Sequence, residues 1–509
     1  LLSLAYYPYH LGFLAWLALV RPLMIISRLP RAEAFGSAYL FGFGFSLFSL
    51  YWIAQVTPPG MITAVFFVAF YYAIVFYVIN RLYAVRPVVG LIGAPLIWVG
   101  MEYFRTLTQF AFPWSDLGYT QAHYLYILQI VSVTSVHGLS LLIVAVNVLL
   151  WQVLESRNSI AARLTFFWSS VGVVLLLIAY GWIVMPAAPL PGKYPVAMLQ
   201  GSVALEEKWR DGNEDQSLHL YDSLARDIAA EASADEQPRL YVWPETSAPA
   251  YLSHDNRRRT MIGRTALATD AYHLVGALGA TVTEEHEWHH NSCYLFSPQG
   301  RMVGRYDKVR LVPFTEQVPY QDRLPFLRRE VLTEYLTFIE TYNVRWWSDF
   351  RPGESARLFT LQSDRGEDTQ FGVLICFEST FPEYSRAMIH QGAHFILGIT
   401  NDTWFGRSVG VHMHSRIFLT RAVETRCWMV RVANSGLSYI VDGHGRIRED
   451  IPLYDVAGRA GAVRKLEDYS VFVEHGDVVG LVSFLLTVLA TGILIVWWFV
   501  DRLRRKSTK

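Results

Sequence analysis

The chain has 509 residues, of which 52% are hydrophobic and only 17% are charged, against a usual charged share of about 25%. This composition argues against a purely soluble protein and predicts a membrane-embedded part within a chain of two or three domains. Lysine plus arginine and aspartate plus glutamate balance at 44 each, so no basic field is present to attract nucleic acid. The three cysteines are an odd number, which excludes a complete disulfide framework and leaves at least one thiol free.

Apolar segments that can cross a membrane lie at both ends of the chain. A hydrocarbon core of about 30 Å takes roughly 20 helical residues. The chain opens inside an apolar stretch without an initiator methionine, so we expect that part of a first helix is missing before Leu1. Arg21 and Pro95 also fit interfacial or kinked segments within their windows. The predicted spans are Leu11–Ser27, Ala34–Val56, Met61–Asn80, Val88–Phe104, Val136–Leu154, Leu164–Met185 and Val478–Val500.

Basic residues in the short connections predict how these helices are oriented. Short loops rich in lysine and arginine resist translocation and stay in the cytoplasm. The basic connections are Arg28–Arg31, Arg81–Arg86 and Arg157–Arg163. The predicted domains are N-terminal membrane helices in 1–185, an extracytoplasmic domain in 186–477, a C-terminal membrane helix in 478–500 and a basic cytoplasmic tail in 501–509.

The block from Pro195 to Val473 has the texture of a soluble α/β domain, because short β-rich runs alternate with amphipathic stretches and turn residues. The predicted strands are Pro195–Gln200, Leu240–Trp243, His273–Leu278, Ser292–Ser297, Met302–Tyr306, Phe371–Cys376, Phe395–Thr400, Met429–Ala433 and Ser438–Val441. The predicted helices are Glu214–Ala232, Asn256–Asp270, Glu383–Gly392 and Val411–Arg426.

Three reactive side chains stand at the ends of predicted strands. Glu245 follows Trp243-Pro244, Lys308 follows Tyr306-Asp307, and Cys376 follows Leu374-Ile375. Each alone also fits a structural role, as a capping carboxylate, a solvated turn residue and a small buried hydrophobe respectively. Together they supply what a cysteine acyl-transfer enzyme needs. A thiol with a pKa of about 8.5 needs a base, and the oxyanion that forms on the carbonyl needs a donor.

The strand-end Glu, Lys and Cys in this order resemble the nitrilase superfamily, and fuller motifs resemble the apolipoprotein N-acyltransferase family within it. Thr315 stands where that family often has Gly, and Phe377 where Tyr is also seen, but neither change removes a reactive group. The motifs are Gln200-Gly201 with Trp209, Trp243-Pro244-Glu245, Lys308 followed by Leu311-Val312-Pro313-Phe314 and Glu316, Cys376-Phe377-Glu378, Asn401-Asp402-Thr403-Trp404-Phe405-Gly406, and Ala433-Asn434-Ser435-Gly436.

The resemblance implies an αββα sandwich in the periplasm, joined to an eight-helix domain in the bacterial inner membrane. It implies that Glu245 is the base, that Lys308 stabilises the tetrahedral intermediate and that Cys376 is the nucleophile. The same family pattern implies supporting roles for two acids, Glu316 and Glu378. The backbone N–H of Phe377 could help to hold the oxyanion, and the side chains implied to line the site are Phe377, Trp404 and Trp209.

The implied activity is transfer of an acyl chain from a membrane phospholipid, through a cysteine thioester, to the amine of a diacylglyceryl-cysteine at a lipoprotein N-terminus. We expect no cofactor, no metal and no nucleic-acid partner, and a monomer in the membrane. Two alternatives stay open at this stage. One is a membrane-tethered amidase that delivers the acyl group to water, and the other is a transporter or lipid-binding scaffold with an inactive domain.

Three further patterns carry weaker signals. The histidines between Glu284 and His290 could hold a metal, although an exposed hairpin is the simpler interpretation. Cys293 and Cys427 fit buried positions, and a disulfide between them stays open. The segment Thr315–Pro352 is long and aromatic with few regular signals, so we hypothesise a mobile lid that includes Phe326, Trp346 and Trp347.

Overall fold

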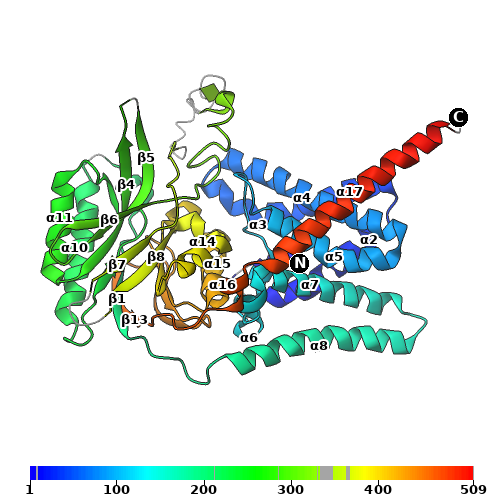
Figure 1. Ribbon diagram of the computed structural model, residues 1–509, viewed down its shortest axis with the longest axis horizontal. Helices are drawn as coiled ribbons and strands as arrows, with labels where there is room; N and C mark the ends of the chain where they lie inside the picture. The colour runs from blue at the N-terminus through cyan, green and yellow to red at the C-terminus, as the bar shows by residue number, and fades with distance from the viewer. Residues whose placement is uncertain are drawn as a thin grey trace. The chain divides into compact units, whose positions relative to one another are not determined.

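The chain folds into two compact units, Leu1–Met185 together with His475–Lys509, and Pro186–Glu474 (Figure 1). The computed structural model describes residues 1–509 except 7, 9, 211, 285, 329–330, 333–347, 363–366 and 508–509, and only the backbone of 505–507. Part of the hypothesised lid, residues 329–330 and 333–347 with Trp346 and Trp347, therefore lies outside the described residues.

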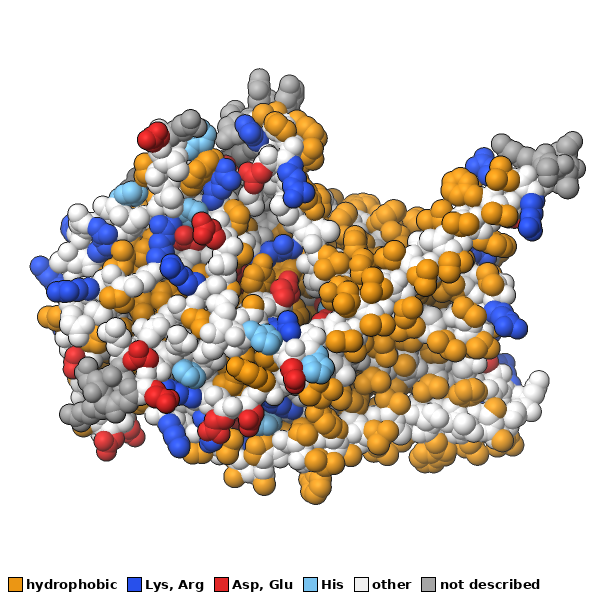
Figure 2. Space-filling model, in the orientation of Figure 1, with side chains coloured by type: hydrophobic (Ala, Val, Ile, Leu, Met, Phe, Trp, Pro, Cys, Tyr) orange, Lys and Arg blue, Asp and Glu red, His pale blue; other side chains and the backbone are white. Residues whose placement is uncertain are grey.

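The first unit is helical. In the described part of the chain, six helical segments are long and apolar enough to cross a membrane by length and composition, and they coincide with six of the predicted spans. Hydrophobic side chains cover the outward faces of α8 and α17 in Figure 2. The long helices are α3 (Arg31–Leu50), α4 (Pro58–Val85), α5 (Pro87–Phe104), α7 (Val131–Glu155), α8 (Ile160–Val184) and α17 (Val478–Ser507).

The predicted span Leu11–Ser27 is not among these six. The structure has a shorter apolar helical segment there, Gly12–Ile26, which contains α1 (Ala15–Ala18) and α2 (Val20–Ile26). Pro22 has no N–H to donate, so the helical hydrogen-bond ladder is interrupted between α1 and α2. At 1.5 Å per residue, neither piece approaches the thickness of a bilayer core.

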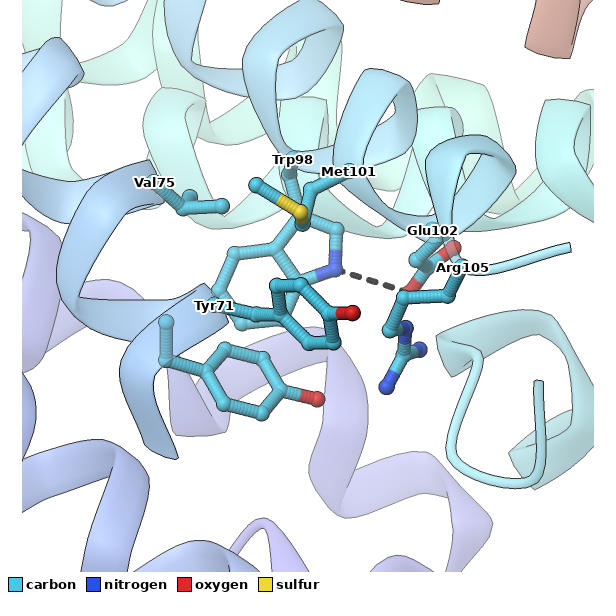
Figure 3. Close-up of a pocket in the computed structure, with 7 residues that line it drawn as sticks. Tyr71, Val75, Trp98, Met101, Glu102 and Arg105 are labelled. Carbon is cyan, nitrogen blue, oxygen red and sulfur yellow. Dashed lines mark hydrogen bonds between the residues drawn. The ribbon is translucent and has the colours of Figure 1, made fainter. Parts of the chain in front are cut away.

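Ionisable side chains inside this unit have polar partners. Trp98 donates to Glu102 within α5 at 2.8 Å, beside a small pocket (Figure 3), and Arg105 donates to Asp116 at 2.5 Å. Charges inside a membrane domain are costly unless they are paired. The Arg105–Asp116 pair joins the end of α5 to the segment that follows it. The pocket is lined by Tyr71, Tyr72, Val75, Trp98, Met101, Glu102 and Arg105.

The second unit contains two β-sheets. The first has the order β13-β1-β2-β4-β5-β6, with β3 paired to β4, and the second has the order β12-β11-β10-β9-β8-β7. The strands are β1 (Tyr194–Gln200), β2 (Leu240–Val242), β3 (Ala248–Tyr251), β4 (Tyr272–Val282), β5 (Glu287–Phe296), β6 (Met302–Asp307), β7 (Leu358–Leu361), β8 (Thr369–Ile375), β9 (Phe395–Thr400), β10 (Met429–Ala433), β11 (Ser438–Val441), β12 (Ile447–Ile451) and β13 (Ala457–Val463).

Helices cover the outer faces of both sheets and complete an αββα sandwich (Figure 1). Alternate residues of β1 face opposite sides, as the strand period of two requires. Val196 and Met198 join the core shared with the second sheet, and Ala197 and Leu199 pack under the helices. The helices are α10 (Glu214–Glu231) and α11 (Asn256–Thr269) on the first sheet, and α14 (Pro382–His390) and α15 (Val409–Thr425) on the second.

The nine predicted strands and four predicted helices of this domain are all present, with ends that differ by at most a few residues. Four strands were not predicted: β3, β7, β12 and β13. β12 is polar and only its last residue, Ile451, is buried, while β13 is rich in glycine and alanine. Such sequences have little intrinsic strand preference, and they are held by pairing with a neighbour, as β13 is along the whole of β1.

Phe371 is central to the core between the sheets. Its ring is fully buried and stacks between Phe359 and Phe395, with centroids 5.4 and 5.5 Å away. We expect Phe371→Ala to lower the free energy of unfolding of this unit by about 3–5 kcal/mol, measured by denaturant unfolding in detergent. Phe326→Ala, at a 62% exposed position, is the control. Equal stability of the two variants would contradict this account of the core.

Candidate active site

Glu245, Lys308 and Cys376 lie at the carboxyl ends of strands that bring them together. Glu245 follows β2, Lys308 follows β6 and Cys376 follows β8. β2 is parallel to β4, and two antiparallel pairings return β6 to the same direction. The backbone N–H of Asn401, just after β9, donates to Glu245 Oε2 at 2.8 Å. The carboxyl ends of the two sheets therefore meet at one site.

The ammonium of Lys308 lies between two carboxylates. Its Nζ is 2.9 Å from Glu316 and 3.7 Å from Glu245 Oε1, and the side chain is buried. Burial alone would lower the pKa of Lys308, but Glu316, Cys376 and Glu245 together raise the pKa above its ordinary value. Lys308 is therefore a permanent cation at neutral pH, fit to stabilise negative charge rather than to carry a proton.

The carboxylate of Glu245 is held through both of its oxygens. Asn291 Nδ2 donates to Oε1 at 2.7 Å and also to Glu316 at 3.0 Å, while the N–H of Asn401 binds Oε2. A Cβ on Gly276 of β4 would collide with the backbone of Pro244 and the Glu245 turn. The turn thus lies close against the neighbouring strand, so the carboxylate has little freedom to rotate.

Cys376 occupies a sharp turn between β8 and a short 3₁₀ helix, η6 (Cys376–Thr380). Its φ of 50° is in the left-handed region, which costs a non-glycine residue of order 1–3 kcal/mol and is typical of functional sites. Burial raises the pKa of its thiol, Glu245 raises the pKa further, and Lys308 and the Thr400 hydroxyl lower it, with a net rise. The thiol is therefore neutral at neutral pH and needs a base to become a nucleophile.

Glu378 joins the lysine turn to the cysteine turn. Its carboxylate accepts from the N–H of Ile375 at 2.7 Å, from the N–H of Val309 at 2.6 Å and from the Tyr306 hydroxyl at 2.7 Å. Burial raises its pKa to about 7, against the lowering effect of these donors. Because its partners flank both Lys308 and Cys376, Glu378 fixes the spacing of the two turns.

The three aromatic residues that were implied to line the site occupy different environments. Phe377 is buried, and its ring packs edge-on against Phe381 with centroids 5.1 Å apart. Trp404 is half-buried in the 3₁₀ helix η7 (Asp402–Phe405). Trp209 is 47% exposed, directly after the short helix α9 (Leu205–Lys208). Trp209 is thus the most accessible of the three to an incoming ligand.

The sequence did not single out four buried polar residues around the triad. Asn291 bridges Glu245 and Glu316, and no local pattern marks it. Asn401 and Asn434 stand in quoted motifs but had no role assigned. The Nζ of Lys208 lies 3.5 Å from the Glu245 carbonyl oxygen. In the sequence, only its neighbour Trp209 belongs to a motif that points to the site.

The other candidate residues lie in ordinary structural positions. Cys293 and Cys427 are buried free thiols. Among the described residues, no group of three or more His, Cys, Asp or Glu side chains could hold a metal ion. His289 and His290 lie on the β4–β5 hairpin, where the ring of His290 contacts the Arg351 carbonyl at 2.9 Å.

Known proteins are similar to this chain over most of its length. Residues 1–149 match the model of the apolipoprotein N-acyltransferase N-terminal domain, and residues 196–453 match that of carbon-nitrogen hydrolase. An apolipoprotein N-acyltransferase from Geobacter metallireducens is 34% identical and covers 94% of this chain and 90% of its own. Another from Chlorobaculum tepidum is 28% identical over 92% of this chain and 89% of its own. A solved nitrilase-superfamily amidase from Nesterenkonia is 17% identical, covers 55% of this chain and 94% of its own, and has a TM-score of 0.38.

The αββα sandwich and the family match of its sheets place the second unit in the nitrilase superfamily and confirm the predicted fold. With relatives that span nearly the whole chain, the protein belongs to the apolipoprotein N-acyltransferase family. It is therefore an N-acyltransferase of bacterial type with apolar helices that can span a membrane.

The raised pKa of Glu378 predicts a pH dependence of stability. A group whose pKa rises from 4.5 to about 7 on folding stabilises the folded state below the lower value, and this contribution is lost as pH rises through the upper one. We expect the melting temperature of the wild type to fall across this window, and Glu378→Gln to flatten the fall. Thermal unfolding in detergent between about pH 4 and 8 measures it. Parallel curves for the two proteins would contradict the assignment.

Proposed function

We propose that Cys376, Glu245 and Lys308 carry out a two-step acyl transfer from a phospholipid to the N-terminal amine of a diacylglyceryl apolipoprotein. The observation that carries this proposal is the buried Lys308 ammonium, which shares one site with the fixed carboxylate of Glu245 and the strained turn of Cys376. The relatives are apolipoprotein N-acyltransferases, which supports an apolipoprotein acceptor, and the apolar helices support a lipid donor.

In the first step, Glu245 takes the proton of the Cys376 thiol and the thiolate attacks the ester carbonyl of the phospholipid. The oxyanion of the tetrahedral intermediate is stabilised by Lys308 and by the N–H of Phe377. As the ester C–O bond breaks, protonated Glu245 returns the proton to the leaving alkoxide. The products of this step are a lysophospholipid and a thioester on Cys376.

In the second step, the α-amine of the acceptor attacks the thioester carbonyl. Glu245 accepts a proton from the amine as the C–N bond forms, and the thiolate leaves and is reprotonated. An α-amine with a pKa of about 7.7–8.0 is partly neutral at pH 7, so it can act as the nucleophile. Since the lysophospholipid leaves before the acceptor enters, the kinetics are ping-pong.

Three substitutions test the roles in the triad. We expect Cys376→Ala to abolish both the acyl-enzyme and overall transfer, because no thioester can form. Glu245→Gln removes the base and Lys308→Ala removes an oxyanion donor, so each should lower the acylation rate by orders of magnitude. A single oxyanion donor is worth roughly 10²–10³ in rate. Intact-mass measurement after incubation with phospholipid, without acceptor and then with a diacylglyceryl peptide, checks each step.

Three outcomes would count against this mechanism. An unmodified Cys376 under excess phospholipid would refute the thioester, as would full transfer by Cys376→Ala. Rapid loss of the acyl group to water without acceptor would instead favour the hydrolase. Cys293→Ala, at a buried thiol on β5, is the matched control and should form the acyl-enzyme normally.

The basic connections support an extracytoplasmic catalytic unit in the bacterial inner membrane. In a Cys376→Ala background the two remaining thiols are buried, so single cysteines placed at exposed Arg157 and Lys193 report topology. We expect a membrane-impermeant maleimide to label Lys193→Cys in intact spheroplasts and Arg157→Cys only after lysis. The reverse pattern would overturn the orientation.

A further inference from the structure

A second buried lysine lies behind the proposed base. Lys208 ends α9, is 1% exposed, and directs its Nζ at the turn that carries Glu245. The Nζ is 3.2 Å from Thr246 Oγ1 and 3.5 Å from the Glu245 carbonyl oxygen. Neither the resemblance nor the triad gives this side chain a role.

The environment of Lys208 differs from that of Lys308. Among the described residues, no salt bridge is found for Lys208, and its hydrogen-bond partners are the two neutral oxygens. Burial lowers its pKa to about 8, while Glu245 acts in the opposite direction. A buried ammonium without a paired carboxylate is costly, so stability alone does not favour lysine here over an apolar residue of the same length.

The turn that Lys208 contacts is strained. Thr246 has a φ of 48°, a left-handed conformation that a β-branched residue rarely adopts without support from its surroundings. A hydrogen-bond donor that reaches both the Glu245 carbonyl and the Thr246 hydroxyl can stabilise this conformation. The conformation of this turn sets the direction in which the Glu245 side chain leaves the backbone.

The loop that carries Lys208 is itself joined to the other side of Glu245. Asn434 Nδ2 donates to the Val203 carbonyl at 2.7 Å, and its Oδ1 accepts the Val203 N–H at 3.1 Å. The same Nδ2 lies 3.1 Å from Asn401 Oδ1, and the N–H of Asn401 binds the Glu245 carboxylate. A closed ring of contacts therefore links the loop, the backbone of Glu245 and its carboxylate.

We propose that Lys208 is a positioning residue for this reaction, which holds the Glu245–Thr246 turn so that the carboxylate faces the Cys376 thiol. The inference rests on the proposed role of Glu245 as the base. Because Lys208 lies behind the turn, we expect it to affect the rate of acylation and not the binding of phospholipid.

Lys208→Met removes the charge and both contacts at nearly constant length. We expect the rate of acyl-enzyme formation at saturating phospholipid to fall about tenfold to a hundredfold, the cost of a small misplacement of a catalytic group. The half-saturating phospholipid concentration should stay unchanged. The melting temperature should stay the same or rise, because an unpaired buried charge is removed. Lys193→Met, at an exposed position in the same unit, is the control.

Thr246→Val keeps the shape of the turn residue and removes only the hydroxyl that Lys208 contacts. We expect a smaller loss of acylation rate, and less than additive effects in the double variant with Lys208→Met, since both remove one interaction. If Lys208→Met does not fold, the acylation rate of Thr246→Val decides whether the contact positions the turn or has a structural role only. A wild-type acylation rate for Thr246→Val would then overturn the proposal.

A wild-type rate for folded Lys208→Met, or a rate loss that tracks a lowered melting temperature, would also overturn the proposal. Failure of the wild-type enzyme to acylate Cys376 would instead refute the proposed function, so the two failures are distinguishable.

Discussion

Burial of an ammonium group is costly unless nearby carboxylates neutralise it, and at Lys308 this constraint organises the candidate active site. Lys308 is buried among Glu316, Glu245 and the Cys376 thiol. Removing one partner of such a set leaves an uncompensated charge and costs about 3–5 kcal/mol. Glu316, with the shorter contact, satisfies most of the charge of Lys308. The proposed base, Glu245, could therefore accept and release a proton while Lys308 keeps Glu316 as its partner.

The same charged set is built from separate pieces of chain, so its precision depends on the turns that follow the strands. Thr246 and Cys376 both have positive φ, and each is secured by polar contacts from a different element. Glu378 secures the cysteine turn to the lysine turn, and Asn401 joins the second sheet to Glu245. The core between the sheets fixes the distance between them, and the turns that follow the strands bring the reactive side chains together.

Much of this arrangement could be predicted from the sequence, because apolar length and strand period are local properties. Cys376 is predicted at a strand end because it follows an apolar run, and Lys308 because it follows a short β-rich run before a turn. Asn291 could not be found, since its importance comes from two carboxylates that are distant in the sequence. Lys208 could not be predicted as a buried residue, because lysine side chains are usually exposed. At Leu11–Ser27 the helical segment is shorter than predicted, because hydropathy alone does not show the hydrogen bond that Pro22 removes.

The catalytic unit is inserted in the chain between α8 and α17, while α17 packs on α5 within the helical unit. Gly100 of α5 leaves room for Ser483 and Thr487 of α17, and Thr487 donates to the Leu96 carbonyl at 3.3 Å. During synthesis, chains fold from the N-terminus as they emerge from the ribosome. Residues 186–474 are therefore synthesised before α17, so Ser483 and Thr487 can pack against Gly100 only after the whole second unit has been translated.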